Sequence, residues 1–81
     1  MNYKYETALK YMPYAQAHIE HDGDRLILWS YYTRVATFNT STGEIEEVTG
    51  LYSTTTRRHI FAFAKEVGLT YQDFRTFYEK A

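Results

Sequence analysis

The sequence predicts an α+β protein, in which a small antiparallel sheet of three or four strands is packed by a short N-terminal helix and two C-terminal helices. Two observations lead to this fold class. Hydrophobic residues between 14 and 49 recur mainly with the two-residue period of a strand, whereas after Gly50 they recur with the 3.6-residue period of a helix. The chain has 81 residues, too few to support two hydrophobic cores, so we expect one domain over residues 1–81.

The N-terminal quarter of the chain predicts a helix followed by a strand. Residues 3–11 (YKYETALKY) carry hydrophobic side chains at near-helical spacing, and Pro13 would stop a helix there. Residues 14–20 (YAQAHIE) alternate between two faces, which is the pattern of a half-buried strand. The sequence DGD at 22–24 then supplies a turn.

The middle of the chain predicts the rest of the sheet. Residues 25–33 (RLILWSYYT) are apolar or aromatic on both faces, so this strand is either covered on both sides or presents its outer face as a binding surface. Residues that favour strands continue to Asn39, and because this run is too long for one strand we expect a turn near 32–34. The hairpin loop 40–43 (TSTG) leads into an acid-decorated edge strand over 44–49 (EIEEVT).

Two helices are predicted at the C-terminal end. Gly68 is a typical stop for the first, and Thr70 with Asp73 resembles a capping box that begins the second. The stripe that we expect the first helix to bury consists of Ile60, Phe63, Ala64 and Val67. The apolar face of the second consists of Tyr71, Phe74, Phe77 and Tyr78.

Composition excludes several classes of protein. With nine Lys and Arg against ten Asp and Glu, the formal charge is −1, so any nucleic-acid binding would be local. The longest hydrophobic run, residues 26–29, is far shorter than a membrane span of ~20 residues. The N-terminus also lacks the apolar segment of a signal peptide, and there is no cysteine, so we expect a cytoplasmic protein with no membrane contact. Aromatic residues make up 19% of the chain, which fits either a small core rich in rings or a contact surface.

The start of the helix after Gly50 is electrostatically unusual. In YSTTTRRHIFAF (52–63), Arg57 and Arg58 fall in or beside the first helical turn, whichever of the three threonines caps it. That turn already carries partial positive charge, so each cation costs roughly 0.3–1 kcal/mol unless an anion offsets it. We therefore predict an anion-binding site consisting of Thr54, Thr55, Thr56, Arg57, Arg58 and His59. The alternative is that the threonines only cap the helix while the arginines pair with Glu44, Glu46 or Glu47.

Other chemistry is less well supported. His18, His21 and Asp22 are possible metal ligands, but nothing in the sequence fixes a coordination geometry or supplies a fourth ligand. There is no nucleophile elbow and no glycine-rich phosphate loop. We therefore expect a protein that is not an enzyme, with no catalytic residues, no metal and no cofactor.

Two segments carry a resemblance to a known group of proteins. LILWSYYTRVATFN contains the pattern S-Y-x-T-x-V-A, and YSTTTRRHIFAF contains Y-S-x-T-T-x-x-H-I. In these patterns the chain resembles a family of small uncharacterised proteins that are encoded by phages and other mobile elements of Gram-positive bacteria. The resemblance covers roughly residues 25–67. Within it, the hydroxyls and His59 would tie the end of a strand to the helix, with Tyr31 and Tyr52 packed beside them.

The resemblance implies a non-enzymatic binding protein in the cytoplasm of a bacterial host. Its partner would be a host protein or nucleoprotein complex, and its effect would be to inhibit host defence or nucleic-acid handling, as an anti-CRISPR protein does. We expect it to act as a monomer or homodimer. The alternative is a direct nucleic-acid or phosphate binder that uses the Thr-Arg-rich helix start, with tyrosines as stacking surfaces. Binding that weakens steeply with salt would favour this alternative.

Overall fold

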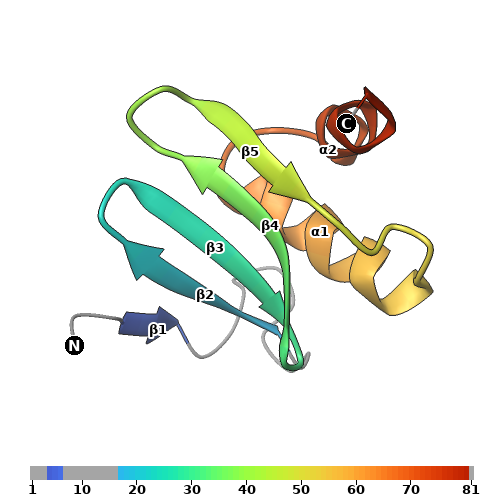
Figure 1. Cartoon of the computed structure of the whole chain (residues 1–81), viewed down its shortest axis with the longest axis horizontal. Helices are drawn as coiled ribbons and strands as arrows, with labels where there is room; N and C mark the ends of the chain where they lie inside the picture. The colour runs from blue at the N-terminus through green and yellow to red at the C-terminus, as the bar shows by residue number, and fades with distance from the viewer. Residues whose placement is uncertain (1–3, 7–16, 81) are drawn as a thin grey trace.

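The computed structural model describes residues 4–6 and 17–80. Five strands form an antiparallel sheet in the order β1-β2-β3-β4-β5, and two helices follow (Figure 1). The elements are β1 (Lys4–Glu6), β2 (Ala17–Asp22), β3 (Arg25–Ser30), β4 (Thr33–Asn39), β5 (Glu44–Val48), α1 (Thr54–Glu66) and α2 (Tyr71–Lys80). The predicted α+β class with an antiparallel sheet and two C-terminal helices is confirmed.

The N-terminal prediction is not supported. β2 to β5 form the predicted four-stranded meander, and Lys4–Glu6 add a short fifth strand that pairs with β2. The helix expected over 3–11 therefore does not include Lys4–Glu6, and its remaining residues lie outside the described part of the chain. A nine-residue helical pattern is marginal by itself, whereas the edge of β2 offers backbone partners to an extended segment.

The long hydrophobic run divides one residue earlier than predicted. β3 ends at Ser30 and β4 begins at Thr33, so the turn consists of Tyr31 and Tyr32. Tyr31 has a positive φ of 56°, which residues other than glycine rarely adopt. The predicted loop 40–43 is confirmed.

The helices lie against one face of the sheet (Figure 1). One hydrophobic core fills the space between them and that face. α1 packs against β3 and β4, and α2 packs against β5 and α1. The rings of Phe63 and Phe74 meet edge to face with their centroids 5.8 Å apart, which joins the two helices. The predicted stripe of α1 is confirmed at Ile60, Phe63 and Ala64, which are buried. Within the described residues, neither helix combines the length and apolar character that crossing a membrane requires.

The predicted boundary between the helices is also confirmed. Gly68 follows α1 with a positive φ of 78°. Thr70 and Asp73 then form a reciprocal capping box at the start of α2. The Thr70 backbone N–H donates to Asp73 Oδ2 at 2.9 Å, and the Asp73 backbone N–H donates to Thr70 Oγ1 at 3.2 Å.

The outer face of the sheet, which points away from the helices, carries ion pairs between side chains of different strands. Arg25 and Glu46 pair at 2.6 Å. The hydrogen bond and charge of Glu46 raise the pKa of Arg25, while Arg25 and then Asn39 lower the pKa of Glu46. Arg34 pairs with Glu47 at 2.9 Å. Two of the three carboxylates of β5, those of Glu46 and Glu47, are thus engaged within the sheet.

Candidate binding site

The N-cap of α1 is Ser53, and none of the three threonines has this role. The Ser53 side chain accepts a hydrogen bond from the Thr56 backbone N–H at 3.4 Å, while Ser53 itself keeps an extended backbone. The expectation that a threonine caps the helix is therefore wrong. Because Thr54 to Thr56 fill the first turn, Arg57 and Arg58 begin the second, where the field of the helix dipole has already weakened. Their cost to the helix is smaller than the sequence suggested.

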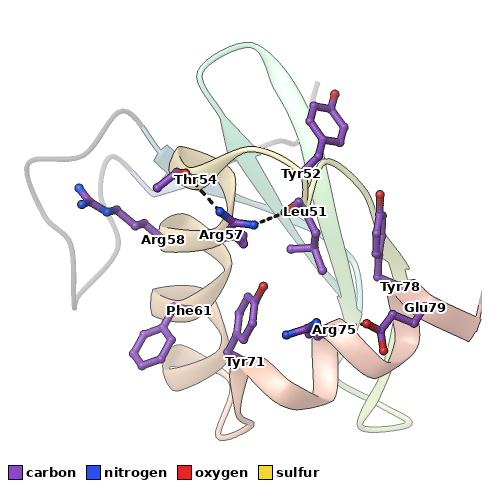
Figure 2. A pocket seen from close by; sticks show the side chains of 10 residues that line it. All are labelled: Leu51, Tyr52, Thr54, Arg57, Arg58, Phe61, Tyr71, Arg75, Tyr78 and Glu79. Carbon is purple, nitrogen blue, oxygen red and sulfur yellow. Dashed lines mark hydrogen bonds and ion pairs between the residues drawn. The ribbon is translucent and has the colours of Figure 1, made fainter.

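Arg57 is held in place by neutral groups. Its guanidinium donates to the Leu51 backbone carbonyl at 3.3 Å and to Thr54 Oγ1 at 3.2 Å (Figure 2). Arg58 forms no hydrogen bond or ion pair with any residue in 4–6 or 17–80. Neither contact of Arg57 neutralises its charge.

The alternative pairing of these arginines with the acids of β5 is not found. Glu46 pairs with Arg25 and Glu47 with Arg34, both on the outer face of the sheet. Within the described residues, no carboxylate pairs with either arginine of α1. The positive charge at the start of α1 therefore remains available to a ligand.

A groove of about 660 Å³ lies between α1, α2 and the segment before α1. We call it the interhelical groove. Arg57, Arg58 and Arg75 line it together with one acid, Glu79. Arg75 Nε pairs with Glu79 at 3.0 Å, so one of the three cations is offset and the groove keeps an excess of positive charge.

The cations of the interhelical groove point in different directions. Figure 2 shows the guanidinium groups of Arg57 and Arg75 directed into the space between the helices, where the Tyr71 side chain also lies. The Arg58 side chain projects away on the outer side of α1. Arg57 and Arg75 are therefore the cations that face a ligand in the groove, and Arg58 lies at its margin.

Aromatic rings surround the same groove. Tyr52, Phe61, Tyr71 and Tyr78 line it, with the buried Leu51 among them. The rings of Phe61 and Tyr71 lie 6.4 Å apart and join the two helices on one side. This combination of guanidinium groups and ring faces suits a ligand that carries both an anionic and an apolar group.

A second hollow of about 660 Å³ connects the β3–β4 turn with the start of α1. We call it the turn hollow. Its lining includes Tyr31, Tyr52, Thr55 and Thr56, so the structure brings these four predicted residues together. Tyr52 and Tyr78 line both the turn hollow and the interhelical groove. The predicted site is thus divided between two adjoining depressions.

His59 lies in the protein interior, away from the surface on which the other predicted residues gather. Its side chain is only 3% exposed, and its Nδ1 lies 2.7 Å from Ser30 Oγ. The ring of Tyr31 packs 6.2 Å away, and burial lowers the pKa of His59. The contact ties α1 to the end of β3, as the structural interpretation of this segment expected.

Sequence reasoning missed the contribution of α2 to the site. Tyr71, Arg75, Tyr78 and Glu79 follow one another at intervals of four, three and one residues, which places them on one side of a helix. That spacing was visible in the sequence, but the partner of this side was not. Only the packing of α2 beside α1 brings Arg75 into the same groove as Arg57.

The fold and the site define a small α+β protein with a cationic, aromatic depression beside its helices. Among the residues that the structure describes, no group of three His, Cys, Asp or Glu side chains could hold a metal ion. The chain belongs to the Family of unknown function (DUF8033), which matches residues 3–79. No curated protein and no solved structure matches it.

Proposed function

We propose that this is a non-enzymatic binding protein that acts by protein–protein contact in the cytoplasm of a bacterial host. In this proposal it covers a surface of a host defence or nucleic-acid-handling complex and so inhibits it, in the manner of an anti-CRISPR protein. The proposal is supported by the resemblance of the sequence patterns around Ser30 and Tyr52 to small proteins of phages and mobile elements. We place the binding surface at the exposed tyrosine rings near the β3–β4 turn and the start of α1.

The observation that carries the proposal is the exposure of three tyrosines. Tyr32 is 96% exposed, Tyr52 is 85% exposed and Tyr31 is 54% exposed. Rings this exposed add little to the core, and single exposed rings are common. Here two of the three line one hollow and the third is adjacent in the same turn. Clustered tyrosines of this kind are typical of the energetic centre of protein interfaces.

The backbone of the turn supports the same conclusion. Tyr31 keeps a φ of 56°, which costs a residue with a side chain roughly 1–2 kcal/mol relative to glycine. A Gly or Asn would form this turn at lower cost. Part of the cost is offset by packing of the Tyr31 ring near His59, but the fully exposed Tyr32 gains no such contact. A role for the turn in binding explains why two rings stand there.

The experiment is capture from a bacterial host lysate on the immobilised protein, with and without nuclease. We expect a discrete protein complex that survives nuclease treatment and is lost with a Tyr32→Ala/Tyr52→Ala variant. Ser41→Ala is the control, because Ser41 is exposed in the β4–β5 loop at the opposite end of the sheet. Equal capture by all three proteins would refute the proposed surface.

A second candidate function is direct binding of single-stranded nucleic acid. It is favoured by the unneutralised Arg57 and Arg58 near the exposed Tyr52, since bases stack on rings while cations hold phosphates. In that case all capture is lost on nuclease treatment. Affinity for an oligothymidylate would also fall steeply with salt, because counterions are released on binding.

A further inference from the structure

We infer that the interhelical groove receives an acidic segment of the partner protein, with a carboxylate held between Arg57 and Arg75 and a neighbouring apolar side chain against the tyrosines. This inference rests on the proposed function, and it identifies the chemistry of the segment that is bound. The groove shares Tyr52 with the turn hollow, whereas Tyr32 in the β3–β4 turn lines neither depression, so Tyr32→Ala and Arg57→Gln test the two surfaces separately.

The charge of the groove is the first argument. Arg57 donates only to a backbone carbonyl and a hydroxyl, which orient its guanidinium and leave its charge without a counterion among the described residues. A guanidinium has five N–H donors, so others remain for a ligand. Arg75 engages Glu79 through Nε and keeps its terminal nitrogens for a second acceptor. A carboxylate between the two arginines would complete both sets of contacts.

The apolar lining is the second argument. Leu51 is buried beside the groove, while Tyr71 and Tyr78 are half-buried and keep part of each ring accessible. Phe61 is about half exposed, and Lys65 lies 5.0 Å from its ring centroid. An apolar or aromatic side chain next to the bound carboxylate would cover these surfaces. The groove therefore selects for an acidic residue beside an apolar one.

The arrangement of charge favours a peptide over a nucleic acid. A nucleic-acid strand is held by cations spaced along a track of phosphates, and its binding is strengthened by a positive field. Here two cations, Arg57 and Arg75, face the groove, Arg75 is paired with Glu79, and the formal charge of the whole chain is −1. One or two carboxylates match this local charge. The planar fork of arginine also fits a carboxylate with two parallel hydrogen bonds.

The test begins with selection of a display library of random short peptides on the immobilised full-length protein. We expect enrichment of Asp or Glu next to an aromatic or aliphatic residue. An enriched peptide and its version with Gln in place of Glu, or Asn in place of Asp, are then titrated by calorimetry. Loss of the carboxylate should raise Kd about tenfold, the effect of one charge-assisted hydrogen bond.

Variants locate the binding. Arg57→Gln should raise Kd about tenfold, and Arg75→Gln by a similar factor, because each removes one guanidinium from the carboxylate. Arg34→Gln is the matched control: it makes the same change of charge on the outer face of the sheet and should change Kd less than about twofold. Thermal unfolding of each variant confirms that it folds. Amide chemical shifts on titration should move along α1 and α2.

Several outcomes would overturn the inference. These are failure to enrich any peptide, enrichment of neutral or basic peptides, equal affinity for the amide version, or equal effects of Arg34→Gln and Arg57→Gln. Binding of an oligothymidylate in the groove without peptide binding would assign it to nucleic acid instead. If lysate capture requires Tyr32 and Tyr52 but is unchanged by Arg57→Gln, the proposed function stands and this inference fails.

Discussion

Replacing Ser30 with alanine tests the buried contact between α1 and the sheet. Ser30 Oγ and His59 Nδ1 lie 2.7 Å apart, and the two residues are 6% and 3% exposed. Alanine removes one oxygen, so the void is small, but Nδ1 is left buried without its partner. An unsatisfied buried polar group costs about 1–3 kcal/mol, a substantial part of the roughly 4–12 kcal/mol expected for a chain of this length.

The assay is urea and thermal unfolding followed by circular dichroism. For a domain of this size, each kcal/mol lost lowers Tm by roughly 4–8 °C. In urea, the midpoint should fall while the m-value stays unchanged, because the surface exposed on unfolding is the same. Ser41→Ala, in an exposed loop, is the control and should remain within about 0.5 kcal/mol of the wild type.

A double-mutant cycle separates the hydrogen bond from other effects of the substitution. In His59→Leu the polar partner is replaced by an apolar side chain of similar size, so Ser30→Ala should cost much less in that background. We expect a coupling free energy of about 1–2 kcal/mol between the two positions. If Ser30→Ala lies within about 0.5 kcal/mol of the wild type, or if the two substitutions are additive, the contact does not hold α1 to the sheet.

Three further predictions concern stability. Burial lowers the pKa of His59 in the folded protein below 6.5, so the unfolded chain binds the proton more readily. The free energy of unfolding should therefore fall as pH drops below 6.5. Urea unfolding at several pH values should show a weaker dependence on pH in His59→Leu. Gly50→Ala, with φ at +73° and its new Cβ 3.3 Å from the Thr56 side chain, should lower the free energy of unfolding, measured by urea titration, by about 1–2 kcal/mol. It should cost more than Gly43→Ala, which has the same φ and nothing within 4 Å, and equal losses would show that the contact is unimportant. Phe74→Ala removes a fully buried ring and should cost about 3–5 kcal/mol by the same assay, whereas a loss below about 1 kcal/mol would contradict the described packing of α2.

Elements with strong periodicity could be predicted from the sequence. The alternation in 17–20, the runs of strand-favouring residues over 25–30 and 33–39 and the helical stripe of α1 are determined by which side chains are apolar, and the structure follows them. The residue at which a helix begins was harder to predict where several neighbouring residues have similar chemistry. Ser53 and the three threonines after it all carry a hydroxyl that can cap a helix. The structure selects Ser53, which keeps an extended backbone and accepts a hydrogen bond from the Thr56 N–H.

The candidate site was only half predictable for a different reason. Thr54, Arg57 and Tyr52 stand out locally because cations and hydroxyls cluster at a helix start. Arg75 and Tyr71 do not, since an exposed arginine and a half-buried tyrosine are ordinary on an amphipathic helix. Their importance comes from the docking of α2 beside α1, which depends on contacts such as that between the Phe63 and Phe74 rings.

The structure also changes the reason for expecting an anion near Arg57. The sequence argument rested on the dipole of α1, and Ser53 as N-cap weakens it by placing the arginine beyond the first turn. The stronger argument is the distribution of counterions: Glu46 and Glu47 neutralise arginines on the outer face of the sheet, while Arg57 is held by neutral acceptors.

Both acceptors of Arg57 are neutral, so neither of its hydrogen bonds requires a charge at position 57. If the guanidinium serves only to hold the start of α1, Arg57→Gln should leave ligand binding unchanged and affect stability alone. If its charge serves a partner, the same variant should keep Tm within a few degrees of the wild type and lose affinity. The comparison of these two measurements on one variant separates a structural arginine from a binding one.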